Sequence, residues 1–487
     1  MEILKLPGEL IHEILCWAAL CRDVRHSVKR TLRLRLVCKA FAEAVYPALF
    51  QSHRLDDAIF DCCFGDVQYL ESMHGTRDLW HRYLVYRVTG ETDPNVGRFV
   101  ETRELAHALC EKDSSLDYQH VVETLCWLAL DNIQRGPCTF REWGAPTCNK
   151  LRPNTNILRR LQDDTVHDEG LNLLAAAVRL GLPSLVKQLV AEGHNPTKPN
   201  FLFPPATQVA AECGSESMMR LLLERKPKPR RPEPYSVFGA AVGGHLDMMR
   251  LVMPPPRPPS TARGTQSTRF TPQLVGRALI ATASPAVYEY LTAAWGMGKT
   301  APVPPPRYEH LMSHAERGNL AMVRYLLDQG VEINGADDYY RGSALSRACR
   351  RGHAEVVGLL LARGANPNFA EDAQKIGLAT HAAAAGGCLS IVRTLLARGA
   401  RVDGPHRGHE KALVAAFETE HTGLVRLLVG RGAPLERVAP WLVSSMLHLG
   451  YESMLDLLRG YGFEPEKDAN GEVVRHRWGT TRTNKVA

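Results

Sequence analysis

The chain has 487 residues, of which 45% are hydrophobic and 23% charged, a balance that excludes wholesale disorder. No apolar run approaches the roughly 18 residues that a membrane-spanning helix needs. Acidic residues and a proline interrupt the apolar N-terminus, whereas the apolar core of a secretory signal is continuous. Twelve cysteines without CxxC pairs indicate reduced thiols, and a net charge of +7 spread along the chain does not favour nucleic acid as a partner. We therefore expect a protein of the cytoplasm, the nucleus or both, away from membranes.

Residues 1–54 are predicted to form a helical module. Pro7 suits the first turn of a helix, because the N–H that proline lacks is not needed there. The apolar residues that follow at helical spacing, on one face, are Leu10, Ile11, Ile14 and Leu15. A later amphipathic helix has its apolar residues at Leu36, Val37, Phe41, Val45 and Leu49.

This module resembles the F-box, the three-helix module that attaches a substrate receptor to the adaptor of a cullin–RING ubiquitin ligase. The residues that match its opening and closing motifs are Leu6, Pro7, Glu9, Leu10, Ile14, Val37, Cys38, Lys39 and Phe41. The resemblance implies an adaptor-binding surface made by Leu6, Pro7, Leu10, Ile14, Val37, Cys38 and Phe41. The segment between the two motifs is longer and more basic than in the family. This leaves open a second interpretation, in which the N-terminal helices only cap the repeats that follow.

Residues 55–165 are predicted to be a helical connector. The segments ELAHALCEK and VVETLCWLALDNI have amphipathic helical patterns, and Gly/Pro-rich breaks separate them from their neighbours. At the other end of the chain, residues 469–487 are polar and are predicted to be a flexible tail.

Residues 166–468 repeat with a period of about 33 residues. One apolar residue, three places before the second-helix leucine, marks each unit; these residues are Val186, Met219, Met249, Val287, Val323, Val357, Val392, Val425 and Leu455. Each unit reads as an alanine-rich helix, a turn that is usually a glycine, and a leucine-rich helix. Since one such unit cannot bury its apolar face alone, stacking of the units must create the core.

These units resemble the ankyrin repeat. The matching residues are the Gly352-His353 and Gly244-His245 pairs between helices, the leucines Leu359, Leu360 and Leu361, and the closing Gly364-Ala365-Asn366. The resemblance implies an all-α solenoid of about nine helix pairs that binds other proteins. Glu420 and Thr282 occupy positions where most units have the interhelix glycine, so their two units are expected to be less regular. Three proline-rich stretches, 226–234, 254–260 and 302–307, are expected to be inserted loops.

The chain offers no convincing catalytic or cofactor motif. The sequence AAWGMGKT fits a loose phosphate-loop pattern, but the prolines after it cannot begin the helix that such a loop needs. His310 and His314 have the spacing of a zinc pair, but no third ligand accompanies them, so ordinary packing in the repeat is expected. We expect no enzyme activity, no cofactor and no metal.

Two functions remain open. In the first, the protein is a substrate receptor of a cullin–RING ligase, with the F-box-binding adaptor and an unknown protein cargo as partners; in the second, it is a free-standing ankyrin scaffold or regulator. The cargo surface is predicted on the first helices and on the fingers, which are the turns that join one unit to the next. Its residues are Tyr339, Tyr340, Arg341, Arg347, Arg350, Arg351, His406, Arg407 and His409. Exposed Tyr and Arg dominate interface hot spots, and the excess of cations here points to an acidic partner.

Overall fold

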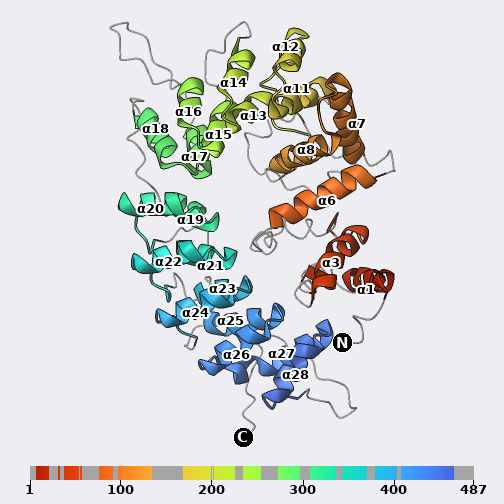
Figure 1. Ribbon diagram of the computed structural model, residues 1–487. Helices are drawn as coiled ribbons and strands as arrows, with labels where there is room; N and C mark the ends of the chain where they lie inside the picture. The colour runs from red at the N-terminus through yellow and green to blue at the C-terminus, as the bar shows by residue number, and fades with distance from the viewer. Residues whose placement is uncertain are drawn as a thin grey trace. The chain divides into compact units, whose positions relative to one another are not determined.

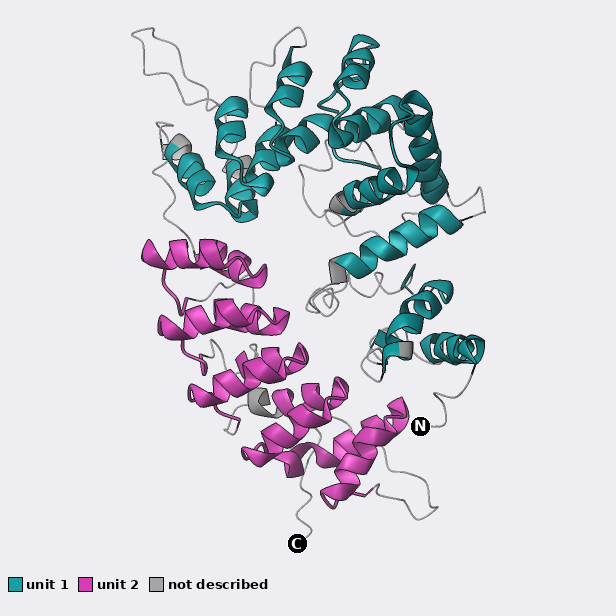
Figure 2. Ribbon diagram, in the orientation of Figure 1, with its two compact units in different colours: residues 1–70, 75–303 teal, residues 71–74, 304–487 magenta. Residues whose placement is uncertain are grey.

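The computed structural model describes residues 7–20, 31–32, 34, 38–53, 55–56, 76–91, 97–133, 168–198, 200, 202–224, 234–253, 272–296, 308–335, 343–369, 379–402 and 407–464 (Figure 1). All regular secondary structure in these ranges is helical, which confirms the all-α class. The helices group into two compact units, residues 1–70 with 75–303 and residues 71–74 with 304–487 (Figure 2). A division at residue 303 is not among those that the sequence predicted, and the divisions at residues 54 and 165 stay predictions.

The first unit begins with helices that precede the repeats. Those described are α1 (Gly8–Leu20), α3 (Lys39–Gln51), α6 (Thr76–Gly90), α7 (Gly97–Lys112) and α8 (Tyr118–Ile133). Helix α1 packs on α3, and α6, α7 and α8 pack on one another. Both α7 and α8 also contact α11 (Glu169–Leu180), the first helix of the repeats, so the array does not begin with an uncovered face.

Nine helix pairs follow in the described residues. In the first unit they are α11 with α12 (Pro183–Ala191), α13 (Ala206–Glu212) with α14 (Glu216–Leu223), α15 (Pro234–Gly243) with α16 (Leu246–Val252), and α17 (Pro272–Ala281) with α18 (Pro285–Gly296). In the second unit they are α19 (Tyr308–Glu316) with α20 (Leu320–Asp328), α21 (Ala344–Arg351) with α22 (Ala354–Ala362), α23 (Ala379–Ala385) with α24 (Leu389–Ala397), α25 (Arg407–Glu418) with α26 (Thr422–Gly430), and α27 (Leu435–Leu449) with α28 (Glu452–Gly460).

The apolar residue that sets the period is buried in every second helix. None of the nine is more than 2% exposed: Val186, Met219, Met249, Val287, Val323, Val357, Val392, Val425 and Leu455. The number of helix pairs expected from the sequence is therefore confirmed, because the pattern that revealed the repeat is the pattern that makes its core.

Small residues let the first helices of successive units approach closely. Within the first unit α13 packs on α11 and α15, and within the second unit α21, α23 and α25 pack in sequence. Ala210, Ala240 and Ala383 are fully buried in these contacts. The approach is very close at Gly239, since a Cβ added there would lie 2.4 Å from the carbonyl oxygen of Gln208. A side chain at this position would push the helices apart.

Most first helices end in a residue with left-handed backbone conformation. Gly352 has a φ of 77° and closes α21, and Glu420 takes the same conformation, with a φ of 52°, after α25. The irregular turn expected at Glu420 is therefore not found. Thr282 does depart from the pattern: its φ is not positive, and its hydroxyl accepts a hydrogen bond from the N–H of Ser284 at 3.2 Å.

Asparagine side chains join the turns that follow successive second helices. The Nδ2 of Asn334 donates to the carbonyl of Gly364, and its Oδ1 accepts from the N–H of Asn366 at 2.8 Å. One unit further, the Nδ2 of Asn368 donates to the carbonyl of Gly399, and its Oδ1 accepts from the N–H of Arg401 at 2.8 Å. Each amide thus pairs both of its polar atoms with the next unit's backbone.

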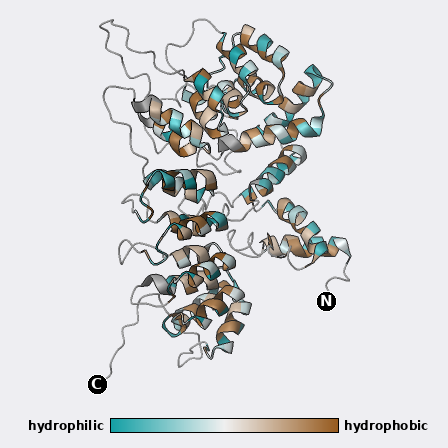
Figure 3. Ribbon diagram, turned by 60° about the vertical axis from the view of Figure 1, so that its left-hand side comes forward, coloured by the Kyte–Doolittle hydropathy of each residue, from teal (hydrophilic) through white to brown (hydrophobic). Residues whose placement is uncertain are grey.

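Figure 3 shows hydrophobic and hydrophilic residues on the same helices throughout the array, as amphipathic packing requires. In the part of the chain that the structure describes, no helix is long and apolar enough to cross a membrane. The three proline-rich stretches lie outside the described residues, apart from Pro234, with which α15 begins. The predicted tail also lies outside them.

Candidate protein-interaction surfaces

Helix α1 buries one side of itself against α3. Pro7 precedes the helix, and its carbonyl accepts from the N–H of both Leu10 and Ile11 at 3.1 Å. The residues buried on α1 are Ile11, Leu15 and Ala19, spaced at four-residue steps along one face. Cys16 reaches α3 at the edge of this contact, where its Sγ lies 3.6 Å from the carbonyl oxygen of Ala48.

The other side of α1 is an exposed apolar stripe, formed by Leu10, Ile14 and Trp17. These residues are 45%, 41% and 64% exposed, and their spacing of four and three residues places them in one row. Among the described residues, only six large hydrophobic side chains are more than one-third exposed, and four of them belong to α1. An exposed row of this kind on an otherwise packed helix is a candidate protein-binding surface.

The single apolar face expected on α1 is therefore divided in two. Ile11 and Leu15 belong to the core, whereas Leu10 and Ile14 face outward with Trp17. Sequence reasoning missed Trp17, although its distance from Leu10 and Ile14 is the signal that could have identified it.

The closing motif has structural roles within α3. The thiol of Cys38 caps the helix by accepting from the N–H of Phe41 at 3.5 Å, and Phe41 itself is only 6% exposed. Phe41 packs in the core with Val45 and Leu49, so among the described residues of the predicted adaptor surface it is the one that is not accessible. Leu6 and Val37 lie outside the described residues.

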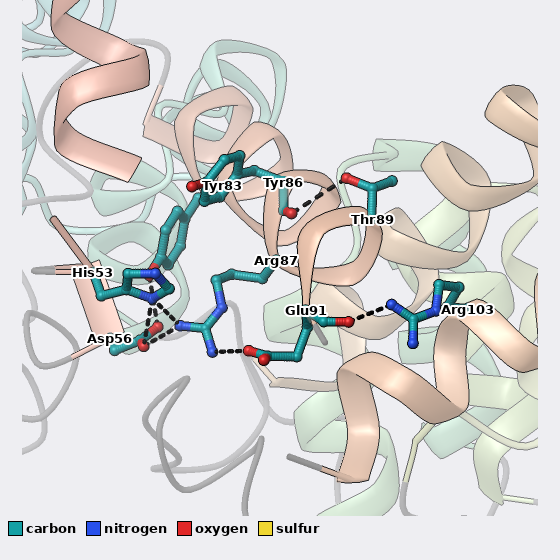
Figure 4. Close-up of polar contacts among 8 residues, drawn as sticks. All are labelled: His53, Asp56, Tyr83, Tyr86, Arg87, Thr89, Glu91 and Arg103. Atoms are coloured by element: carbon teal, nitrogen blue, oxygen red, sulfur yellow. Dashed lines mark hydrogen bonds and ion pairs between the residues drawn. The ribbon is translucent and has the colours of Figure 1, made fainter. Parts of the chain in front are cut away.

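A buried polar cluster joins the end of α3 to α6 (Figure 4). Arg87 donates to the Oδ2 of Asp56, to the Nδ1 of His53 at 2.6 Å and to the Oε2 of Glu91 at 2.7 Å, while the hydroxyl of Tyr83 donates to Asp56 Oδ1 at 2.7 Å. Arg87 is 7% exposed, and these bonds pair both terminal nitrogens of a guanidinium that has left water, whereas its buried Nε has no hydrogen-bond partner among the described residues.

The charges in this cluster keep Asp56 ionised. Burial by itself would raise the pKa of its carboxyl, but the hydrogen bonds from His53 and Tyr83 and the charge of Arg87 outweigh burial and lower that pKa. The ring of Phe50 adds apolar contact, with its centroid 5.3 Å from that of Tyr83. The N-terminal helices are thus fixed to α6 by both polar and apolar contacts.

The cationic residues on α21 are engaged within the array. Arg347 and Arg351 both donate to the carboxylate of Glu316 at the end of α19, the second of them at 3.1 Å. The expectation that Arg351 is an exposed contact residue is wrong: it is 9% exposed, because the ion pair draws it between successive first helices. Burial would raise the pKa of Glu316, but the charges of the two arginines outweigh it and hold that pKa below its usual range.

The structure describes only some of the other predicted cargo residues. Arg350 is half-buried on α21 and has contacts of its own. Tyr339, Tyr340, Arg341 and His406 lie outside the described residues, and the structure describes only the backbone of Arg407 and His409, in the first turn of α25. Of the predicted cargo residues, the structure describes the side chains of Arg347, Arg350 and Arg351 on α21.

Histidines on the first helices are packing residues. His310 and His314 are both buried on α19, at 5% and 0% exposure. Burial and the charges of Arg350 and Lys411 lower the pKa of His381 to about 4, so this histidine is neutral near pH 7. Across the described ranges, no three His, Cys, Asp or Glu side chains converge as ligands of a metal ion would.

Comparisons with known proteins identify the repeats. The family profile described as ankyrin repeats, in three copies, matches residues 284–371. Human cyclin-dependent kinase 4 inhibitor B is 38% identical over 95 residues, which cover 67% of that protein and 20% of this chain. The chain belongs to the ankyrin-repeat family.

Two other ankyrin-repeat relatives match this chain over a small share of their own length. Human ankyrin repeat and KH domain-containing protein 1 is 40% identical over 99 residues, which are 20% of this chain and 4% of that protein. Human ankyrin repeat domain-containing protein 63 is 36% identical over 110 residues, which are 22% of this chain and 29% of that protein. This chain therefore spans less than a third of the length of either relative. Ankyrin repeats are protein-binding modules, with extended surfaces made by the stacked units.

Proposed function

We propose that this ankyrin-repeat protein is a substrate receptor of a cullin–RING ubiquitin ligase: its N-terminal helices bind the F-box adaptor and its repeats bind a protein cargo. The observation that supports this most is the exposed row of Leu10, Ile14 and Trp17 on α1. Two of these three residues belong to the motif that resembles the F-box. In this role the protein performs no chemistry; it raises the effective concentration of the cargo near the ligase.

A free-standing ankyrin scaffold is the second candidate, and the polar cluster around Arg87 favours it. Through this cluster and the packing of Phe50 on Tyr83, the end of α3 contacts α6, which packs on α7 and α8, the two helices that cover α11. A cap, however, has no need for three exposed large apolar residues on its outer helix. The two candidates therefore differ in what they require of α1.

Co-purification of the F-box adaptor with the full-length chain separates them. The wild type should capture the adaptor, while Ile14→Glu combined with Trp17→Glu should abolish capture, because two carboxylates would have to be buried in an apolar interface. Tyr461→Glu is the matched control, since Tyr461 is a similarly exposed aromatic residue on the last turn of the array and its replacement should leave capture unchanged. Failure of the wild type to capture the adaptor would remove the receptor proposal and leave the scaffold.

The cargo site is proposed on the repeats. Arg347 and Arg351 support the stacking of units through Glu316, and we assign them that role in preference to direct contact with cargo. The finger residues Tyr339, Tyr340 and Arg341 remain the predicted contacts on that side. The expected compartments are the cytoplasm, the nucleus or both.

A further inference from the structure

The exposed cations of the array are divided unevenly between its two kinds of helix. On the first helices, Arg347 and Arg351 are held by Glu316. Four second helices, α14, α16, α20 and α28, carry both a cation and an acid. Arg220 pairs with Glu216, Arg250 with Asp247, and Arg363 of the turn after α22 with Asp328 of α20. In each of these cases an acidic side chain of the protein already neutralises the cation.

Helices α24 and α26 differ from this pattern. Each has an exposed arginine immediately after the buried valine that marks its unit, as α20 has in Arg324. Unlike α20, each also has a second arginine five residues later, at the turn that closes the helix: Arg393 and Arg398 on α24, Arg426 and Arg431 on α26. None of these four arginines makes an ion pair with any residue that the structure describes. We call them the α24–α26 arginine face.

No acid and no bulky side chain accompanies these arginines on their own helices. Neither the α24 segment LSIVRTLLA nor the α26 segment TGLVRLLVG contains Asp or Glu. The residues exposed around Arg393 are small and neutral, namely Ser390, Thr394 and Ala397. The guanidinium groups are therefore accessible to a ligand and are not screened by a neighbouring carboxylate of these helices.

The four arginines form a regular group, because their helices belong to consecutive units. Helices α23 and α25 pack on each other, so α24 and α26 occupy equivalent places in neighbouring pairs. The packed first helices lie roughly 8–10 Å apart, which sets the smallest spacing of α24 and α26, and five residues advance about 7.5 Å along a helix. The group is thus about the size of a short peptide segment, with a fork-shaped donor at each corner.

We propose that the α24–α26 arginine face binds an acidic peptide segment of a partner protein. Guanidinium groups bind carboxylates through paired N–H···O bonds, and four unpaired arginines at the corners of a compact group suit a segment with several Asp or Glu residues. A nucleic acid fits less well, because its backbone requires a longer basic track, whereas Glu355 lies on the first turn of α22 and Glu436 on that of α27. The proposal rests on the protein-binding role of the repeats and not on adaptor binding.

The test is fluorescence anisotropy with the full-length chain and a labelled oligo-glutamate peptide, with oligo-glutamine of the same length and oligothymidylate as comparison probes. The wild type should bind oligo-glutamate and not oligo-glutamine, and affinity should fall with added salt. Replacing Arg393, Arg398, Arg426 and Arg431 by Gln should weaken oligo-glutamate binding by about tenfold or more. The charge-matched control replaces Lys187, Lys198, Arg220 and Arg250 by Gln and should change the affinity by less than about twofold.

Three results would overturn the proposal: no binding of oligo-glutamate by the wild type, an equal loss in the control variant, or tighter binding of oligothymidylate than of the peptide. Equal circular-dichroism melts for the two variants show that both are folded. Adaptor capture by the four-arginine variant is measured in parallel. If the four-arginine variant loses peptide binding but still captures the adaptor, the defect lies in the arginine face. If even the wild type captures no adaptor, loss of peptide binding in the variant still supports the arginine face and refutes only the receptor proposal.

Discussion

Glu420 holds the same left-handed backbone conformation as Gly352, two units earlier in the array, with φ values of 52° and 77°. The Cβ of an ordinary L-residue is strained in this conformation by roughly 1–2 kcal/mol, and glycine is not. The packing of α25 on α26 therefore holds Glu420 in a left-handed turn that a residue with a Cβ disfavours.

Replacing Glu420 by Gly should accordingly stabilise the second unit. We expect a gain of about 0.5–1 kcal/mol, because relief of strain is partly offset by the greater freedom of glycine in the unfolded chain. Gly352→Glu is the reverse experiment and should destabilise by a similar amount. Urea unfolding measures both changes, and a loss of stability in Glu420→Gly would show that contacts of the glutamate side chain outweigh the strain.

Replacing Leu395 by Asp should severely destabilise the array. The leucine is fully buried on α24, so the substitution removes its apolar contacts and leaves an unpaired carboxylate among apolar side chains. A loss of at least about 3 kcal/mol is expected. Thr394→Asp, on the exposed side of the same helix, should change stability by less than about 0.5 kcal/mol. Similar melting curves for the two variants would contradict the burial of Leu395.

Replacing Glu316 by Gln should destabilise the second unit near pH 7 by about 1–3 kcal/mol, because the buried Arg351 and the half-buried Arg347 lose their charged partner. The pKa of Glu316 is lowered in the folded protein, so the stability from its ion pairs is complete above the unfolded-state pKa of glutamate, about 4.3, and is lost as pH falls through the lower folded-state pKa.

The difference in stability between wild type and Glu316→Gln should consequently shrink as the pH is lowered through that range. Glu355→Gln, at an exposed glutamate of α22, serves as the control and should show little difference at any pH. A constant difference between wild type and Glu316→Gln down to acidic pH would argue against the ionised carboxylate as the cause.

Replacing Asp56 by Ala should loosen the attachment of the N-terminal helices. Arg87 would then keep Glu91 as a carboxylate partner but lose the charged hydrogen bond to Asp56, a change that costs about 1–3 kcal/mol. Hydrogen exchange should report this as faster exchange of the amides of α3 and α6. Asp78→Ala, at an exposed acid in the first turn of α6, should leave those exchange rates unchanged. Unchanged exchange in Asp56→Ala would mean that the apolar packing of Phe50 alone fixes α3.

Much of the fold could be predicted from the sequence because the repeat is read directly from its core. The spacing of residues such as Val323, Val357 and Val392 records which side of each second helix is buried, and one period locates all the helices. The division of the chain near residue 303 could not be predicted in this way, because the period continues across it.

The candidate sites were harder to predict, because they depend on which helix covers which side chain. On α1, four apolar residues form a face too wide to be buried by one neighbour, and only the position of α3 determines that Ile11 is inside and Ile14 outside. The α21 segment itself offers no acidic partner for Arg351. Its partner, Glu316, is about one period away, so pairing of residues one repeat apart is the signal that would have identified it.

The asparagine bonds between successive turns have a consequence for how such an array can change in evolution. Asn334 and Asn368 each bond to the same two backbone positions of the following unit. Duplication or loss of one whole unit in this part of the array restores identical partners on both sides of the junction, whereas an insertion of a fraction of a unit would leave amide and backbone groups unmatched. The array can therefore lengthen or shorten by entire repeats, and with each added repeat the surface available to a partner grows by one fixed increment.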